Sequence, residues 1–269
     1  MLVTGKKTAR FFRSLATSWQ EMTPDCGAEV AELLQQRSQL QPDGKWLVLW
    51  KTRNKFVLLL DLPSGRQVVY KAPLRVKNFY KYLLRLSPYG KEAANFRNLQ
   101  KLDLPLVKLL AAGEDRCCFK LKSGFLVTEF AGNFANGRDF IPAVNKQNDS
   151  ALTEEFIRRN LAYLGRMHRA GWAHRGFTPA NLLYRVLPEP TADGDRLELR
   201  WIDLASCIKL TIFHNRRRQM VRDLSLFFHY FDFTEAETAD LLTAYLTVNP
   251  ALAADSLSLY KQICANPVR

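Results

Sequence analysis

The sequence lacks several features that would assign it to a common class of protein. No apolar run approaches the ~20 residues that a membrane-spanning helix requires. The segment Met1–Gln20 is basic, but it has neither the continuous apolar core nor the small-residue cleavage site of a secretory signal. There is no internal repeat and no low-complexity tract. We therefore expect a cytoplasmic protein with a packed core.

Cysteine is scarce and scattered, which excludes a disulfide framework or a zinc site. The cysteines are Cys26, Cys117, Cys118, Cys207 and Cys264. Their number is odd, and no two pairs have the spacing of metal ligands. Reduced thiols are the expectation.

Acidic residues are outnumbered, with 26 Asp and Glu against 39 Lys and Arg and a net charge of +13. Such a balance favours anionic partners: a phosphorylated glycolipid, an anionic membrane surface or a nucleic acid. Nucleic acid is the least favoured, because the chain has no helix-turn-helix, RRM or zinc motif.

The positive charge is concentrated in two places. The stretch Lys71–Lys91 mixes lysine and arginine with aromatic residues and leucine, which suits docking at a membrane surface or, equally, a basic helix packed on its own domain. The run Arg216–Arg218, with Arg222 nearby, could contact phosphate or form a solvated helix start.

Apolar periodicity predicts strands in the first half of the chain and helices in the second. The expected strands are Trp46–Trp50, Phe56–Leu60, Val68–Lys71, Leu104–Leu110 and Phe125–Phe130. The expected helices are Lys91–Leu102, Leu152–Ala170, Met220–Phe233 and Ala236–Tyr245. At 269 residues, the chain has the size of one unit with two lobes.

The most informative motif runs from His174 to Asn181. A protein-kinase catalytic loop reads H-R-D, with an Asn five residues after the Asp. Here His174 and Arg175 are followed by Gly176, and Asn181 has the correct spacing. The catalytic base is therefore missing. His174 fits a packed structural residue of the loop better than a replacement base.

Two metal ligands remain in this motif. The strand-like runs Asn181–Val186 and Leu197–Ile202 predict a hairpin that brings Asn181 close to Asp203. An amide oxygen and a carboxylate suit Mg²⁺. Each residue alone has an ordinary alternative, a turn residue for Asn181 and a helix cap for Asp203.

A kinase-type site also needs a strand lysine to hold the ATP phosphates and a helix glutamate to orient it. Lys71 is the lysine candidate, and either Glu92 or Asn95 occupies the pairing position. The turn Lys51–Lys55 stands where kinases have a glycine-rich loop. It has no glycine. Its cationic side chains therefore either contact phosphate or simply make the turn a solvated hairpin tip.

Two further positions complete the candidate site. Glu129–Gly132 is the predicted hinge between lobes, where backbone groups would bind adenine. Arg222 and Asp223 are expected to be either a buried ion pair that braces the catalytic loop or a surface pair.

In the order and spacing of these motifs, the chain resembles the bacterial lipopolysaccharide core kinases, the Kdo and heptose kinase group. The resemblance covers roughly residues 45 to 247 and rests on Val69–Lys71, Arg75–Lys91, Phe96–Leu99, Met167–Arg175, Ile202–Ala205 and Arg222–Leu224. It implies that Lys71 binds ATP, that Asp203 binds Mg²⁺ and that the base would act on a sugar hydroxyl. Gly176 departs from the family at the position of that base.

The resemblance implies an α+β, bilobal protein-kinase-like fold. We expect an N-terminal extension (1–44), a small antiparallel sheet lobe with one main helix (45–130) and a mostly helical lobe (131–269). The implied function is ATP-dependent phosphorylation of a lipopolysaccharide core sugar, slowed or abolished by Gly176. The alternative is an inactive pseudokinase scaffold or regulator in cell-envelope biogenesis. The implied location is cytoplasmic, with peripheral contact to the inner membrane.

Overall fold

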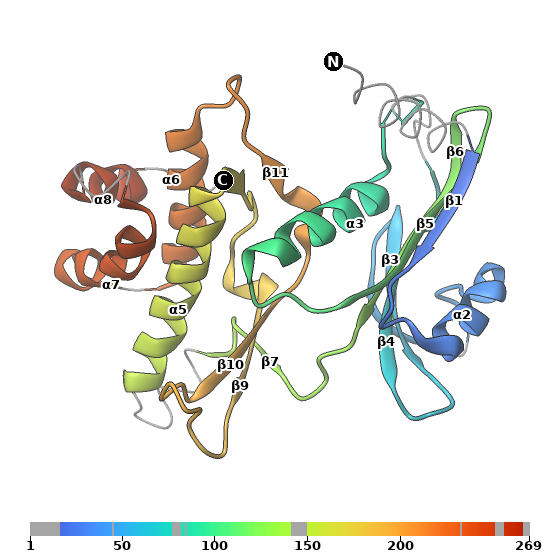
Figure 1. Cartoon of the computed structure of the whole chain (residues 1–269), viewed down its shortest axis with the longest axis horizontal. Coiled ribbons are helices and arrows are strands. Elements are labelled where there is room, and N and C mark those ends of the chain that lie inside the picture. The colour runs from blue at the N-terminus through green and yellow to red at the C-terminus, as the bar shows by residue number, and fades with distance from the viewer. Residues whose placement is uncertain are drawn as a thin grey trace. The chain divides into compact units, whose positions relative to one another are not determined.

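A computed structural model of the chain describes residues 17–44, 46–76, 82–83, 85–140, 150–231, 233–250 and 256–265 (Figure 1). The chain divides into two compact units. The first comprises Met1–Phe96 and Val107–Phe130, and the second Arg97–Leu106 and Ala131–Arg269. The predicted lobe boundaries stay a prediction. Within the predicted basic stretch, Lys77 and Lys81 lie outside the described residues.

An antiparallel sheet forms the first unit, with six described strands in the order β1-β5-β6-β4-β3-β2. The strands are β1 (Thr17–Met22), β2 (Leu47–Lys51), β3 (Lys55–Asp61), β4 (Gln67–Pro73), β5 (Leu109–Cys117) and β6 (Lys120–Glu129). The three predicted strands between Trp46 and Lys71 are confirmed, and so is the predicted strand Phe125–Phe130. The predicted strand Leu104–Leu110 is wrong, since β5 begins only at Leu109.

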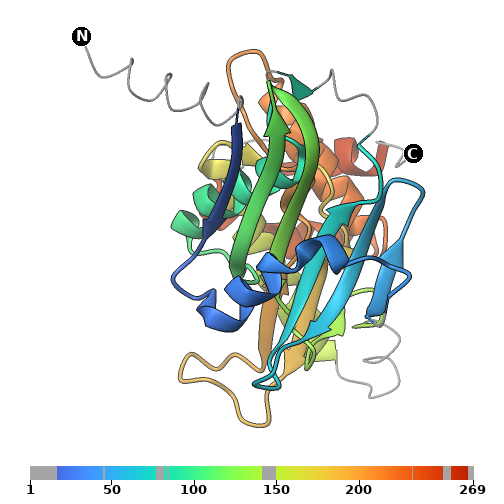
Figure 2. The same cartoon turned by 90° about the vertical axis from the view of Figure 1, so that its right-hand side faces the viewer.

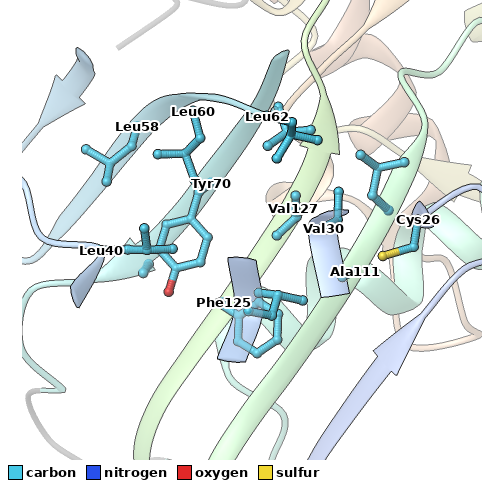
Figure 3. Close-up of a cluster of buried hydrophobic side chains, with 14 of the residues drawn as sticks. Cys26, Val30, Leu40, Leu58, Leu60, Leu62, Tyr70, Ala111, Phe125 and Val127 are labelled. Carbon is cyan, nitrogen blue, oxygen red and sulfur yellow. The ribbon is translucent and has the colours of Figure 1, made fainter. Parts of the chain in front are cut away.

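Helix α2 (Gly27–Gln35) covers one face of this sheet (Figure 2). Its Val30 and Leu34 pack in a buried apolar cluster with residues of β3, β4 and β6, including Leu58, Tyr70 and Val127 (Figure 3). Side chains alternate along a strand. Because Tyr70 and Ala72 of β4 point into this cluster, Lys71 points to the opposite face.

Helix α3 (Pro88–Leu99) belongs mostly to the first unit and is followed by the 3-10 turn η3 (Gln100–Leu102). It corresponds to the predicted helix Lys91–Leu102, starting three residues earlier. Both β1 and α2, together with the 3-10 turn η1 (Arg37–Gln39), lie in the segment expected to be an extension. Sequence periodicity did not predict them.

The second unit is mostly helical, as expected. Its long helix is α5 (Ser150–Arg169), whose buried face includes Phe156, Leu161 and Leu164. The other described helices are α6 (Arg216–Phe228), α7 (Glu235–Val248) and α8 (Ser256–Ala265). No helix among the described residues is both long enough and apolar enough to cross a bilayer.

Two small antiparallel sheets complete the second unit. The first has the order β10-β9-β7, from β7 (Ala135–Asn136), β9 (Leu182–Val186) and β10 (Leu197–Trp201). The second pairs β8 (Trp172–Ala173) with β11 (Ile208–Lys209). Short 3-10 turns, η4 (Pro179–Asn181) and η5 (Leu204–Ser206), precede β9 and follow β10. The predicted hairpin from Asn181 to Ile202 is therefore confirmed.

Candidate active site

The loop from His174 to Asn181 connects β8 to β9. Arg175 has a φ of 63°, and Asp203, after β10, has a φ of 58°. A left-handed backbone costs a residue with a Cβ atom roughly 1–2 kcal/mol. Such strain persists only where the surrounding structure holds it, and it is concentrated at functional sites. The backbone at Arg175 and at Asp203 is therefore strained, and the surrounding structure must hold it in place.

Asp223 of α6 holds the first bend. Its fully buried carboxylate accepts hydrogen bonds from the backbone N–H of His174 at 2.7 Å and of Arg175 at 2.6 Å. Arg222 is exposed, so the predicted buried ion pair between Arg222 and Asp223 is wrong. Consecutive helix residues point in different directions, and only Asp223 faces the loop. The predicted bracing is correct, but it acts on backbone amides.

A buried polar chain extends from Asp223 to α7. Asp223 contacts His168 Nε2 at 3.1 Å, His168 Nδ1 contacts the Tyr245 hydroxyl at 2.8 Å, and Asn249 donates to the same hydroxyl at 2.8 Å. Burial raises the pKa of Tyr245. Because its hydroxyl already accepts from Asn249, the hydroxyl donates to Nδ1 when the imidazole is neutral. The proton on Nε2 then faces Asp223, which fixes the histidine tautomer.

Gly165 allows this series of buried hydrogen bonds to form. A Cβ atom at Gly165 would lie 2.3 Å from Val248 Cγ2 and 2.9 Å from the Tyr245 carbonyl oxygen. Any side chain there would push α7 away from α5. The glycine thus allows the two helices to approach closely enough for Tyr245 to reach His168.

His174 is fully buried and packs edge-on against Phe177 and Trp201. Neither ring nitrogen has a hydrogen-bond partner among the described residues. Desolvation lowers the pKa of His174, and the nearby charges of Asp223 and Asp203 only partly oppose it. This environment supports the packing role expected from the sequence.

Gly176 stands at the position of the missing base. Its carbonyl accepts a hydrogen bond from Asn181 Nδ2 at 2.8 Å, while Ser206 Oγ donates to the His174 carbonyl at 2.7 Å. A Cβ atom at Gly176 would lie 3.1 Å from Ser206 Oγ and 3.8 Å from Asn181 Nδ2. A side chain here would therefore project toward Asn181 and Ser206. Only a shift of a few tenths of an ångström would be needed to fit it.

Asn181 and Asp203 come together at one end of the β9–β10 hairpin. The Ile202 N–H donates to the Asn181 carbonyl at 3.0 Å, and Asp203 is the next residue. Since the Asn181 amide nitrogen binds Gly176, its amide oxygen is the ligand atom that this arrangement offers. In the described part of the chain, no three His, Cys, Asp or Glu side chains form a metal cluster. Magnesium sites often use only one or two carboxylates, with phosphates and waters.

Lys71, in the first unit, forms an ion pair with Glu92. Lys71 Nζ lies 2.9 Å from Glu92 Oε1, and the two side chains are 22% and 4% exposed. Of the two residues that the sequence left open, Glu92 is therefore the one that contacts the lysine. Asn95 is also buried, one turn further along α3.

A buried network on β5 anchors the start of α3. Glu114 and Arg116 form an ion pair with Nε–Oε2 at 2.7 Å, and neither side chain is exposed. Glu114 Oε1 also accepts the N–H of Ser87 at 2.6 Å, one residue before α3, and Arg116 donates to the carbonyls of Tyr82 and Arg85. This network fixes where α3 begins, and hence where Glu92 lies.

The two other predicted nucleotide contacts are engaged within the first unit. The Glu129 carboxylate accepts the N–H of Lys108 at 2.9 Å. In the turn Lys51–Lys55, Lys51 Nζ pairs with Asp43 at 2.9 Å, and Lys55 Nζ lies 4.6 Å from the Trp50 ring centroid. These contacts favour a solvated hairpin tip, in which Arg53 is the remaining candidate for a phosphate contact.

Sequence reasoning missed the residues that support the site. Glu114 and Arg116 are charged residues on a strand whose other residues are mostly buried, and such a pattern indicates a buried pair. His168 lies on the buried face of α5, where a histidine needs a hydrogen-bond partner. Its partners on α6 and α7 are far away in the sequence, so spacing alone could not identify them.

Comparison with known proteins gives a family and a fold. The model of the lipopolysaccharide kinase (Kdo/WaaP) family matches residues 74–245, which is more than half of the chain. This range includes Glu92, Gly176 and Asp203, whereas Lys71 lies just before it. No curated protein sequence matches significantly.

Two solved structures show the same fold. A structure of WaaP in complex with acyl carrier protein matches with a TM-score of 0.67 and 17% identity, covering 91% of this chain and 96% of that chain. The BubR1 kinase domain matches with a TM-score of 0.50 and 14% identity, covering 90% and 98%. The α+β, bilobal protein-kinase-like fold is thus confirmed, and this chain belongs to the lipopolysaccharide kinase (Kdo/WaaP) family.

Proposed function

We propose that this chain transfers the γ-phosphoryl group of ATP to a hydroxyl of a lipopolysaccharide core sugar, at a rate limited by the missing base at Gly176. The observation that carries the proposal is the ion pair between Lys71 and Glu92 at 2.9 Å. A lysine held by a nearly buried glutamate is the arrangement that kinases use to bind phosphates.

In this proposal, Lys71 binds the ATP phosphates and Glu92 orients its ammonium group. Lys71 keeps 22% of its side chain exposed, so part of it is accessible to a ligand. Glu92 is buried and anchored at one end of α3. Backbone groups of the predicted hinge, Glu129–Gly132, bind the adenine edge.

Asn181 and Asp203 would hold Mg²⁺, through one amide oxygen and one carboxylate. These donors fit a hard cation that completes its octahedron with phosphate oxygens and water. When bound, Mg²⁺ neutralises charge on the transferring phosphoryl group. The hydrogen bond from Asn181 to the Gly176 carbonyl fixes the amide orientation in advance.

Gly176 has no side chain that could take the proton of the acceptor hydroxyl. General-base catalysis is typically worth ~10² to 10⁴ in rate. Phosphoryl transfer passes through a loose transition state, in which early proton removal matters less. We therefore expect slow transfer with positioning retained. Arg175, whose side chain is exposed beside Gly176, is the cation in this loop that could contact an anionic acceptor.

Charge and family support the proposed acceptor and the proposed place of action. A net charge of +13 suits a phosphorylated glycolipid presented at an anionic membrane surface. Because ATP is the donor, the reaction belongs on the cytoplasmic side of the inner membrane.

A second candidate is a pseudokinase scaffold or regulator of envelope biogenesis, which Gly176 specifically favours. Such a protein could keep Lys71, Glu92, Asn181 and Asp203 to bind nucleotide without turning it over. The two candidates therefore differ in transfer and agree on nucleotide binding.

The test combines transfer with binding. Purified protein is incubated with γ-labelled ATP, Mg²⁺ or Mn²⁺, and dephosphorylated core lipid, beside the variants Asp203→Ala and Lys71→Met. Label in the lipid that disappears in both variants supports the kinase. A nucleotide-dependent thermal shift without any transfer by the unchanged protein, under either metal, would reject the kinase and support the pseudokinase.

A further inference from the structure

The turn Thr211–His214, between β11 and α6, exposes two large apolar side chains. Ile212 is 93% exposed and Phe213 is 90% exposed. Among the described residues, the next most exposed large apolar side chain is Leu47, at 62%. Isolated surface hydrophobics are ordinary, but two adjacent side chains almost fully in water indicate a contact that the isolated chain does not make.

The turn is held in shape by its own hydrogen bonds. The His214 N–H donates to the Thr211 carbonyl at 3.0 Å, and His214 Nδ1 accepts from the Thr211 backbone N–H at 3.0 Å. The next residue, Asn215, caps α6 by accepting the Arg218 N–H at 3.0 Å. Ile212 and Phe213 are therefore presented by a closed turn fixed to a helix start. Figure 1 shows the loop that joins β11 to α6.

The surroundings of the turn are positively charged. Between Leu204 and Arg222 the sequence has no Asp or Glu, and its cations are Lys209, Arg216, Arg217, Arg218 and Arg222. All of these except Arg217 are exposed. A Cβ atom at Gly171 would lie 3.5 Å from Lys209 Nζ and 3.8 Å from Arg216 Nη2. Cations from β11 and α6 thus meet at the base of the turn.

Apolar side chains at the tip of the turn and cations at its foot match the order of acyl chains and phosphates in an anionic membrane surface. Apolar side chains leave water for the boundary between headgroups and acyl chains, while lysine and arginine remain at the level of the phosphates. We propose that the turn Thr211–His214 inserts Ile212 and Phe213 into an anionic phospholipid surface, with Arg216 and Arg218 contacting the headgroups.

Within the second unit, the turn lies close along the chain to a strand that pairs with the start of the candidate site. β11 pairs with β8, through Ile208 with Ala173 and Lys209 with Trp172. β8 leads directly into His174, so the strand that ends at the turn lies beside the strand that begins the catalytic loop. The benefit of this contact for phosphorylation rests on the proposed function, because docking would bring the site to an acceptor that lies in the membrane.

The first experiment is vesicle co-sedimentation without nucleotide, which makes it independent of catalysis. Wild-type protein should bind vesicles of phosphatidylethanolamine and phosphatidylglycerol, and its affinity for them should fall as salt is raised. It should bind phosphatidylcholine vesicles poorly. The variant I212S/F213S should lose roughly tenfold in affinity for each side chain removed. The matched control L47S/L49S, which changes exposed leucines of β2, should bind as wild type.

Two further measurements distinguish insertion into a membrane from docking on a protein. R216E/R218E should weaken binding to anionic vesicles more than the control K101E/K122E, which makes the same charge change elsewhere. A tryptophan placed by F213W should be quenched by brominated lipid on binding. Equal vesicle binding by wild type and I212S/F213S would overturn the proposal. If wild type binds acyl carrier protein and I212S/F213S does not, with vesicle binding retained in that variant, the proposal would be overturned in favour of a protein-docking surface.

Discussion

The main-chain N–H of His174 donates a 2.7 Å hydrogen bond to the buried carboxylate of Asp223. The same carboxylate accepts the N–H of Arg175, whose backbone is left-handed. One acidic side chain on α6 therefore compensates for the strain of the loop His174–Asn181. The brace is present although Gly176 stands where a kinase loop has its aspartate.

Replacing Asp223 with alanine should destabilise the protein by about 3–5 kcal/mol, because two backbone amides and the His168 imidazole would be left buried without their partner. Urea unfolding measures this. The adjacent variant Arg222→Ala is the control, and its exposed position predicts a change within about 0.5 kcal/mol. Equal effects of the two substitutions would contradict the bracing role.

Stability should fall in mild acid because of His174. Burial lowers the pKa of His174 in the folded protein, whereas the unfolded chain binds a proton near the ordinary value of about 6.5. Below that pH the unfolded state holds more protons, so stability decreases as pH falls, by up to about 1.4 kcal/mol per pH unit.

The variant His174→Leu should lack this component, so its unfolding free energy should depend less on pH between about 6.5 and 5. Denaturant unfolding at several pH values tests the difference. His229→Gln, which changes a histidine outside the buried loop, should keep the wild-type dependence. Identical curves for wild type and His174→Leu would show that His174 titrates normally.

Gly176→Asp should raise the rate of phosphotransfer by ~10² to 10⁴ if the missing base limits the reaction. The backbone at Gly176 is outside the left-handed region, and a Cβ atom needs only a small shift of Ser206 Oγ. Single-turnover transfer to core lipid is the measurement. Gly176→Asn has the same size without basicity, and an equal gain in that variant would refute general-base restoration.

Glu114→Gln should destabilise the first unit by about 3–5 kcal/mol and weaken nucleotide binding, because it leaves Arg116 buried without its charge partner and loosens the start of α3. Thermal denaturation and ATP titration measure the two effects. Asp115→Asn is the control, since its ion pair with Arg37 is partly exposed and should contribute less than about 1 kcal/mol.

The positions of Asn181, Asp203 and Lys71 could be predicted because they depend on local pattern. Asn181 and Asp203 lie at the end of a hairpin whose apolar runs and polar connection are evident in the sequence. Lys71 follows from antiparallel strands joined by short turns. In each case the residues that fix the position are near neighbours along the chain.

The supporting parts could not be predicted, because tertiary packing decides them. Glu92 and Asn95 share one face of a helix, so only the placement of α3 against the sheet selects Glu92. The chain from Asp223 through His168 to Tyr245 and Asn249 joins three helices. The error at Leu104–Leu110 has a similar cause: Pro105 accepts the Trp201 N–H and Leu106 bridges to Trp201, although the run looks like a strand.

That last contact has a practical consequence for dissecting the molecule. Arg97–Leu106 belongs to the second unit, although it is interposed between two segments of the first. A fragment beginning at Ala131 would lose the partner of Trp201, and one ending at Phe96 would lose β5 and β6. Neither half can be excised by a single cut. Expression of the halves as independent pieces would require circular permutation or a loop that replaces residues 97–106.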